Sequence, residues 1–348
     1  MKKVFNSSFI VALIGLICAY FWGEYRLPSS GLKCLFVAFF LAILEITLSF
    51  DNAVVNVMKL EKMTEKWQHR FVTWGILIAV FGMRLVFPIL VVAFFSHLSI
   101  LSVTKMALSD VDSYTHYLHL AHPALVSFGG AFLMMIFLAY FFNPEKEVHW
   151  LKPIEEPLKK LCIVKYIDIV LCLLTIYAVE FIVPAEQKLN VVMSGLLGVI
   201  TFLIIESISS TMEKVMSKKF DLAGEGAKLG FVGFLYLELI DASFSLDGIL
   251  GAFAISKDVI IIMIGLAIGA MFVRSLTLYF VEQKTLKQFI FLEHGAHWAI
   301  GALAIIMFIS TVKELPEIVT GLIGLLLVGS SFLASVKHNK DEQTLLHE

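Results

Sequence analysis

The sequence predicts an all-α membrane protein, and three features of its composition support that class. Hydrophobic residues make up 59% of the 348 residues and charged residues only 16%, against the roughly 25% usual in soluble domains. Apolar stretches of about 16 to 27 residues alternate with short charged connections, and such lengths suit helices that cross a bilayer. The formal net charge of −2 leaves no basic field for nucleic acid.

The apolar stretches predict a polytopic protein with about ten transmembrane helices. We expect the first of them to be retained, because no A-x-A-like cleavage site follows it. None of the connections is large enough for a separate folded domain. The predicted spans are residues 8–23, 32–58, 71–96, 123–142, 163–183, 190–210, 228–254, 258–282, 289–312 and 316–336.

Lysine and arginine gather in alternate connections between these spans, and positive residues near span ends stay in the cytoplasm. The pattern predicts a multi-pass protein of the inner (plasma) membrane with both termini cytoplasmic. We expect one integrated domain built from a first half, residues 1–189, and a second half, residues 190–336. Residues 337–348 form a polar cytoplasmic tail.

The four cysteines lie singly and form no C-x-x-C pair, which argues against a thiol metal site or redox centre. No Walker A motif is present, so direct ATP coupling is unsupported. No nucleophile, base and orienting group recur at catalytic spacing, and an enzyme is not expected. We expect these cysteines to be packing residues: Cys18, Cys34, Cys162 and Cys172.

A motif of paired acids occurs twice in the chain. The residues from Glu45 to Asn52 read Glu-Ile-Thr-Leu-Ser-Phe-Asp-Asn, and those from Asp241 to Gly248 read Asp-Ala-Ser-Phe-Ser-Leu-Asp-Gly. The two copies lie five spans apart, an odd number, so they cross the membrane in opposite directions. This indicates an inverted repeat, in which transporters place their ion site near the bilayer midplane.

A second echo follows each copy of the acidic motif. Gly75 and Arg84 share a Gly-x8-Arg spacing with Gly265 and Arg274. The two arginines can compensate part of the buried negative charge, because an unpaired charge at the bilayer centre costs at least about 2.5 to 3.5 kcal/mol. If every deep acid is ionised, three negative charges remain after both arginines are counted. A divalent cation plus one proton would neutralise them, or desolvation keeps some acids protonated. The deep acids are Glu45, Asp51, Glu238, Asp241 and Asp247.

Geometry sets a condition on a shared ion site. Six residues of an ideal helix turn through about 600°, so the two acids of one motif point about 120° apart and lie about 9 Å apart along the axis. One unbroken helix therefore cannot bring both to one small ion, whereas an unwound stretch that lines a cavity can. The carboxylates, Ser49, Asn52, Ser245 and freed carbonyls would then form an all-oxygen cage suited to Mn²⁺, Ca²⁺ or Mg²⁺. Glu238 is either a ligand or an arginine partner.

At the paired acidic motifs the chain resembles the TerC family of integral membrane proteins. That family has Glu-x-x-Leu-Ser-x-Asp-Asn-Ala early and Asp-x-x-Phe-Ser-Leu-Asp later, and the resemblance covers about residues 32–336. It implies a role in manganese efflux or tellurium resistance. The metal-site candidates that it implies are Glu45, Asp51, Asn52, Asp241 and Asp247.

Histidines lie in two other places. In the connection of residues 96–122, successive histidines of a His-x-x-His-x-x-His spacing would turn about 300° around a helix, so we expect a solvated loop rather than a metal-capture tract. His294 and His297 lie near the cytoplasmic start of a span, where interfacial hydrogen bonding competes with proton handling, and His294 is a further supporting candidate. The polar residues of the connection are Asp110, Asp112, His116, His119 and His122.

Two functions compete on these observations. The first is a secondary transporter that exports a divalent metal, with manganese favoured as substrate, protons as the exchanged ion and no cofactor. The second is a non-transporting membrane scaffold for envelope or stress-resistance complexes. The sequence names no protein partner, and the lipid bilayer is the expected surroundings in both cases.

Overall fold

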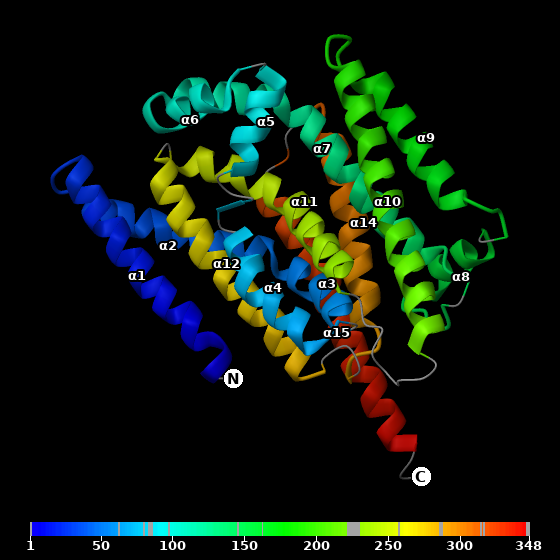
Figure 1. The fold of residues 1–348 in the computed structure, drawn as a ribbon. Helices are drawn as coiled ribbons and strands as arrows, with labels where there is room; N and C mark the ends of the chain where they lie inside the picture. The colour runs from blue at the N-terminus through cyan, green and yellow to red at the C-terminus, as the bar shows by residue number, and fades with distance from the viewer. Residues whose placement is uncertain are drawn as a thin grey trace.

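The computed structural model describes residues 2–61, 63–78, 81–82, 86–96, 98–144, 146–161, 163–220, 230–256, 258–284, 288–313, 315 and 317–345. Within these ranges the regular structure is α-helical and no β-strand occurs (Figure 1). Seven helices among the described residues are long and apolar enough to cross a membrane. The all-helical, multi-pass class predicted from composition is therefore confirmed.

Every predicted span overlaps at least one helix. The predicted span 32–58 consists of two helices, α2 and α3, and the span 71–96 contains α4 and α5. The helices of the first half are α1 (Lys2–Arg26), α2 (Gly31–Leu48), α3 (Phe50–Leu60), α4 (Glu65–Leu77), α5 (Phe87–Ser96), α6 (Ile100–Ser109), α7 (Val111–Phe141), α8 (Lys152–Leu161) and α9 (Ile167–Ile182). Those of the second half are α10 (Lys188–Phe220), α11 (Phe231–Ile255), α12 (Val259–Glu282), α14 (Leu292–Ser310) and α15 (Glu317–Leu345).

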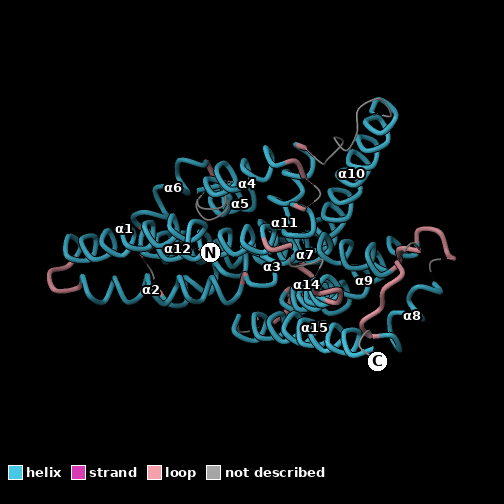
Figure 2. Tube along the Cα trace, turned by 90° about the horizontal axis from the view of Figure 1, so that it is seen from below, coloured by secondary structure: helices cyan, strands magenta, loops and turns pink. Residues whose placement is uncertain are grey.

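Two buried helices organise the bundle. Helix α7 packs against α10, α14 and α9, while α12 packs against α2 and α1, so helices of the two halves interleave (Figure 2). In the most apolar stretch of α7, 78% of the residues are buried, against 11% in α1. Apolar side chains that stay exposed on peripheral helices suit contact with lipid tails.

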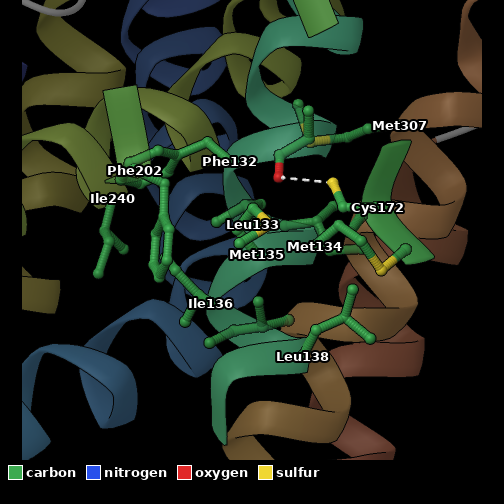
Figure 3. Close-up of a cluster of buried hydrophobic side chains, with 14 of the residues drawn as sticks. Phe132, Leu133, Met134, Met135, Ile136, Leu138, Cys172, Phe202, Ile240 and Met307 are labelled. Atoms are coloured by element: carbon green, nitrogen blue, oxygen red, sulfur yellow. Dashed lines mark hydrogen bonds between the residues drawn. The ribbon is translucent and has the colours of Figure 1, made fainter. Parts of the chain in front are cut away.

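The largest core lies where α7, α9, α10, α11 and α14 meet. Phe132 and Met135 of α7 are fully buried there beside Phe202 of α10 and Met307 of α14 (Figure 3). The Cys172 thiol is also fully buried and donates to the Ala131 carbonyl at 3.6 Å. The packing role expected for this cysteine is confirmed, whereas Cys162 lies outside the described residues.

The segment expected to be a solvated loop is helical. Residues 100–109 form α6, and α7 begins at Val111, so the histidines of this segment lie on a helix. His116 and His119 are exposed, while His122 is buried with 5% of its surface exposed. The loop prediction was wrong because Ser99 and Asp110 act as N-caps and accept from the backbone N–H groups of Ser102 and Ser113. The three histidine rings point in different directions around α7, as the His-x-x-His-x-x-His spacing predicts.

Close contact between α2 and α12 positions the first acidic motif. A Cβ added at Gly269 of α12 would meet Glu45 Cβ and lie 2.8 Å from the Ala42 carbonyl oxygen, and one at Gly265 would lie 2.5 Å from Leu41 Cβ. Small residues four apart let two membrane helices approach until their backbones touch. The pair therefore holds Glu45 against α12.

Replacing Gly269 by alanine should lower the free energy of unfolding by about 1–3 kcal/mol, because an overpacked interface must shift its backbones. Chemical unfolding in detergent measures the change. Gly329 of α15 is the matched control, because a Cβ there meets nothing within 4 Å. Its alanine variant should be as stable as the wild type or up to about 1 kcal/mol more stable. Equal effects at both positions would contradict the close contact.

Candidate functional site

The first acidic motif lies at a helix break. Helix α2 ends at Leu48, Ser49 has φ −100° and ψ 16°, and α3 begins at Phe50. The Ser49 hydroxyl donates to Glu45 Oε1 at 3.0 Å, and Glu45 is 4% exposed. A departure from regular helix is therefore present in the first motif. In the second motif α11 continues from Phe231 to Ile255 without a break.

Asp241 of α11 is the centre of a buried polar constellation. Its Oδ1 accepts from Asn52 Nδ2 at 2.9 Å and from Asn56 Nδ2 at 2.8 Å, both on α3. Its Oδ2 accepts from Arg274 Nη2 of α12 at 2.7 Å. A carboxylate only accepts, so both amide N–H groups must face it. One carboxylate thus joins α3, α11 and α12.

Arg274 also contacts Glu238 and α4. Its Nη2 lies 3.2 Å from Glu238 Oε1, and its Nη1 donates to the Phe71 carbonyl at 2.8 Å. The guanidinium carbon lies 4.0 Å from the centre of the Phe71 ring. Gly75 leaves the room for this arrangement, because a Cβ there would collide with the guanidinium and with Glu238. Glu238 is therefore an arginine partner, one of the two roles the sequence left open.

Asn56 is a site residue that sequence reasoning missed. It is 1% exposed, and no group in the described part of the chain hydrogen-bonds its Oδ1. A buried acceptor left unsatisfied costs about 1–3 kcal/mol. A cation beside this oxygen would remove that cost. The available signal was its position four residues after Asn52, on the same helix face.

Of the predicted metal set, the described residues show Asn52 and Asp241 in contact. Glu45 contacts Ser49 and Gly269. Among the described residues no three His, Cys, Asp or Glu side chains gather as a metal site. A metal site formed by the full set stays a prediction. Arg84 and the side chains of Asp51, Ser245 and Asp247 lie outside the described residues.

A second buried cluster surrounds Glu155 of α8. Its side chain accepts from His294 Nδ1 at 2.9 Å, Trp298 Nε1 at 3.1 Å and Lys146 Nζ at 3.0 Å. The backbone N–H of Leu151 donates to it at 3.2 Å. The His294 ring joins α14 to α8, and its supporting role at the metal site stays a prediction. No pattern in the sequence indicates this contact, because the partners of Glu155 lie in a loop and in a distant helix.

Burial of Glu155 acts to raise the pKa of its carboxyl, but the hydrogen bonds from His294 and Trp298 outweigh it and hold the pKa well below its ordinary value of 4.5. Lys146 behaves differently, because burial lowers the pKa of its ammonium group although Glu155 opposes the shift. A depressed carboxyl pKa stabilises the fold at a pH above the ordinary value, and the stabilisation is lost as the pH falls below it.

Replacing Glu155 by glutamine should lower the free energy of unfolding at neutral pH by about 1–3 kcal/mol. The amide N–H of the glutamine would face the groups that donate to the carboxylate in the wild type. The difference from wild type should shrink as the pH falls below 4.5, the ordinary glutamate value. Thermal unfolding across this range measures it. Glu156 is the matched control, since it is the next residue and is exposed. A loss that stays constant down to acid pH would contradict the ionised anchor.

The fold and the site together define an all-helical multi-pass membrane protein with a buried, charged constellation where α3, α11 and α12 meet. The chain matches the family described as "Protein of unknown function (DUF475)" over residues 50–342, and it belongs to that family. The match begins at Phe50, so it includes Asn52, Asn56 and the second acidic motif and leaves out Glu45. No curated protein and no solved structure matches the chain.

Proposed function

We propose that the protein is a secondary transporter that exports a divalent metal cation, with Mn²⁺ as the favoured substrate. The observation that carries the proposal is the Asp241 constellation, with a buried Asn56 oxygen that no described group hydrogen-bonds. Carboxylate and amide oxygens are the ligands that hard divalent cations prefer. Ionisable residues within membrane helices commonly mark ion pathways.

In this proposal a metal ion and Arg274 compete for Asp241. In the structure the Arg274 guanidinium donates to Asp241 Oδ2. Its positive charge neutralises the carboxylate as a bound cation would. An arriving metal ion releases Arg274 toward Glu238, which already accepts from it at 3.2 Å. Oxygen ligands come from the set predicted by sequence, with Asn56 added to it: Glu45, Asp51, Asn52, Asn56, Asp241 and Asp247.

The proposal includes about ten spans in two inverted repeats, within the plasma membrane and with both termini cytoplasmic. Three features support it. The motif helices α3 and α11 are in contact. The long apolar α10, α11 and α12 follow the first half in sequence and interleave with it. Helix α1 begins and helix α15 ends toward the lower side of Figure 1. The resemblance to the TerC family rests on the two acidic motifs.

Proton exchange supplies the driving force in this scheme. Moving two positive charges outward against about 100 mV, inside negative, costs about 4.6 kcal/mol. Ligands must be deprotonated to bind a metal, so metal and protons compete for the same carboxylates. The carboxylates bind metal from the cytoplasm, release it outside and return protonated.

Metal flux into inside-out membrane vesicles tests the function, with Mn²⁺, Ca²⁺, Mg²⁺ and Zn²⁺ compared. We expect Mn²⁺ to accumulate and a trapped pH dye to report a more alkaline lumen as protons leave. The rate should fall as the pH is lowered from about 8 to about 6, because protons occupy the ligands. Absence of flux for all four metals would rule out this transport activity. Equal flux across that pH range, with no proton movement, would rule out the exchange mechanism.

One observation favours the scaffold as a second candidate. Asp241 already has three donors from its own chain, so its constellation can serve purely to fix the positions of α3, α11 and α12. A scaffold predicts that Asp51→Asn and Asp247→Asn each leave the protein's phenotype intact.

A further inference from the structure

A cavity of about 170 Å³ lies one residue along the chain from two members of the Asp241 constellation. Its lining includes Val55 and Ile240, the sequence neighbours of Asn56 and Asp241. A buried water needs about 10–15 Å³ of such volume, so the cavity has room for several waters. It lies where α3 and α7 end and where α11 and α14 begin, along the side of α10. The polar residues of its lining are Lys59, Tyr140, Glu206, Tyr236, Glu293 and His297.

His297 presents an available ring nitrogen in this cavity. Its Nδ1 lies 2.8 Å from the Glu293 carbonyl oxygen, and a carbonyl only accepts, so Nδ1 carries the hydrogen. Nε2 of the neutral ring therefore keeps its lone pair. The residue is 7% exposed, and no described group hydrogen-bonds Nε2. The Tyr140 ring stacks on the imidazole, with centroids 3.5 Å apart and planes 6° apart, and holds its orientation.

Charges of both signs face the imidazole. Lys59 comes from α3, where its Nζ lies 4.3 Å from the Tyr236 ring. Glu206 comes from α10, and Glu293 and His294 come from α14, while Lys146 lies in the connection after α7. No three metal ligands gather among the described residues, so the arrangement suits exchange of a proton better than capture of a metal.

We propose that His297 carries protons between the buried carboxylates and the water at the cavity end of the bundle. The inference rests on the proposed metal–proton exchange and names the residue through which its protons leave. A carboxylic acid of the acidic motifs loses its proton through cavity water, and Nε2 gains one. The imidazolium then gives that proton to water at the mouth of the cavity and returns to the neutral form. The balance of each cycle is one proton moved and no net change in His297.

His297→Asn is the primary test. Asparagine keeps an N–H near the position of Nδ1, so the bond to the Glu293 carbonyl survives, while the base at Nε2 is lost. In proteoliposomes with a trapped pH dye we expect metal-driven proton movement to slow by about 10- to 100-fold, as for loss of an acid–base group. Its dependence on pH should flatten. Exposed His69 of α4 is the matched control, and His69→Asn should keep the wild-type rate and pH profile.

A second measurement distinguishes loss of the base from poor folding of the variant. In His297→Ala, imidazole added to the buffer should enter the vacated space and restore proton movement, whereas a purely structural loss would not respond to it. Wild-type rate and pH profile in His297→Asn would overturn this inference and leave the proposed function standing. Slow transport in His297→Ala with no response to imidazole would also overturn it. Absence of metal flux in the wild type would overturn the proposed function, and this inference with it.

Discussion

Replacing Arg274 by methionine is expected to lower the free energy of unfolding by about 3–5 kcal/mol, the range seen when one partner of a buried ion pair is removed. Methionine fills much of the space but leaves Glu238 and Asp241 without their cation. Those two residues are 3% and 8% exposed, so water cannot replace the lost charge. The loss of the bond to the Phe71 carbonyl adds to the effect. Chemical unfolding in detergent measures it.

Arg26 provides the matched control. Its side chain is 53% exposed and its Nε lies 3.8 Å from Asp258, so Arg26→Met should cost less than about 1 kcal/mol. The double variant Arg274→Met with Glu238→Gln should be more stable than Arg274→Met alone, because one uncompensated charge is gone. Residues in one network show such non-additive effects. Equal losses at Arg274 and Arg26 would remove the argument for a buried ion-paired centre.

Much of the helical architecture could be predicted because the signal is long and repeated. Apolar stretches near bilayer length locate the helices along the chain, although α7 begins twelve residues before the predicted span and α10 ends ten residues after its span. The acids of the two motifs stand out in so apolar a chain. The charge balance also predicted that Arg274 would compensate deep acids, and the structure pairs it with Asp241 and Glu238. Each of these predictions depends only on the residue types within one segment of the chain, and the sequence shows those residue types directly.

The missing parts of the site depend on contacts between distant segments. Asn56 carries no charge, so a search for buried acids passes over it, although it is as close to Asp241 as Asn52 is. Glu155 lies in a polar connection and becomes buried only because α14 brings His294 and Trp298 to it. Neither contact has a periodic signal. The helices in residues 100–122, by contrast, had readable caps at Ser99 and Asp110.

The constellation separates two kinds of carboxylate variant. In Asp241→Asn an amide N–H would face Asn52, Asn56 or Arg274, all of which donate to this side chain. That variant should therefore lose stability, and lost transport in it would not identify a ligand. Two other motif acids, Asp51 and Asp247, are the better probes of mechanism when folding of each variant is verified by size-exclusion chromatography.

Asp51→Asn and Asp247→Asn should each abolish metal flux in proteoliposomes, whether or not a pH gradient is imposed. An amide keeps the size and one oxygen of the carboxylate but removes the negative charge and the proton that the exchange requires. A fold that is unchanged, with flux at the level of protein-free liposomes, supports direct participation of both acids. Exposed Asp112 of α7 is the matched control, and Asp112→Asn should retain wild-type flux. If both motif variants fold and transport at the wild-type rate, the carboxylates do not carry the ion, and the scaffold becomes the better account of the protein.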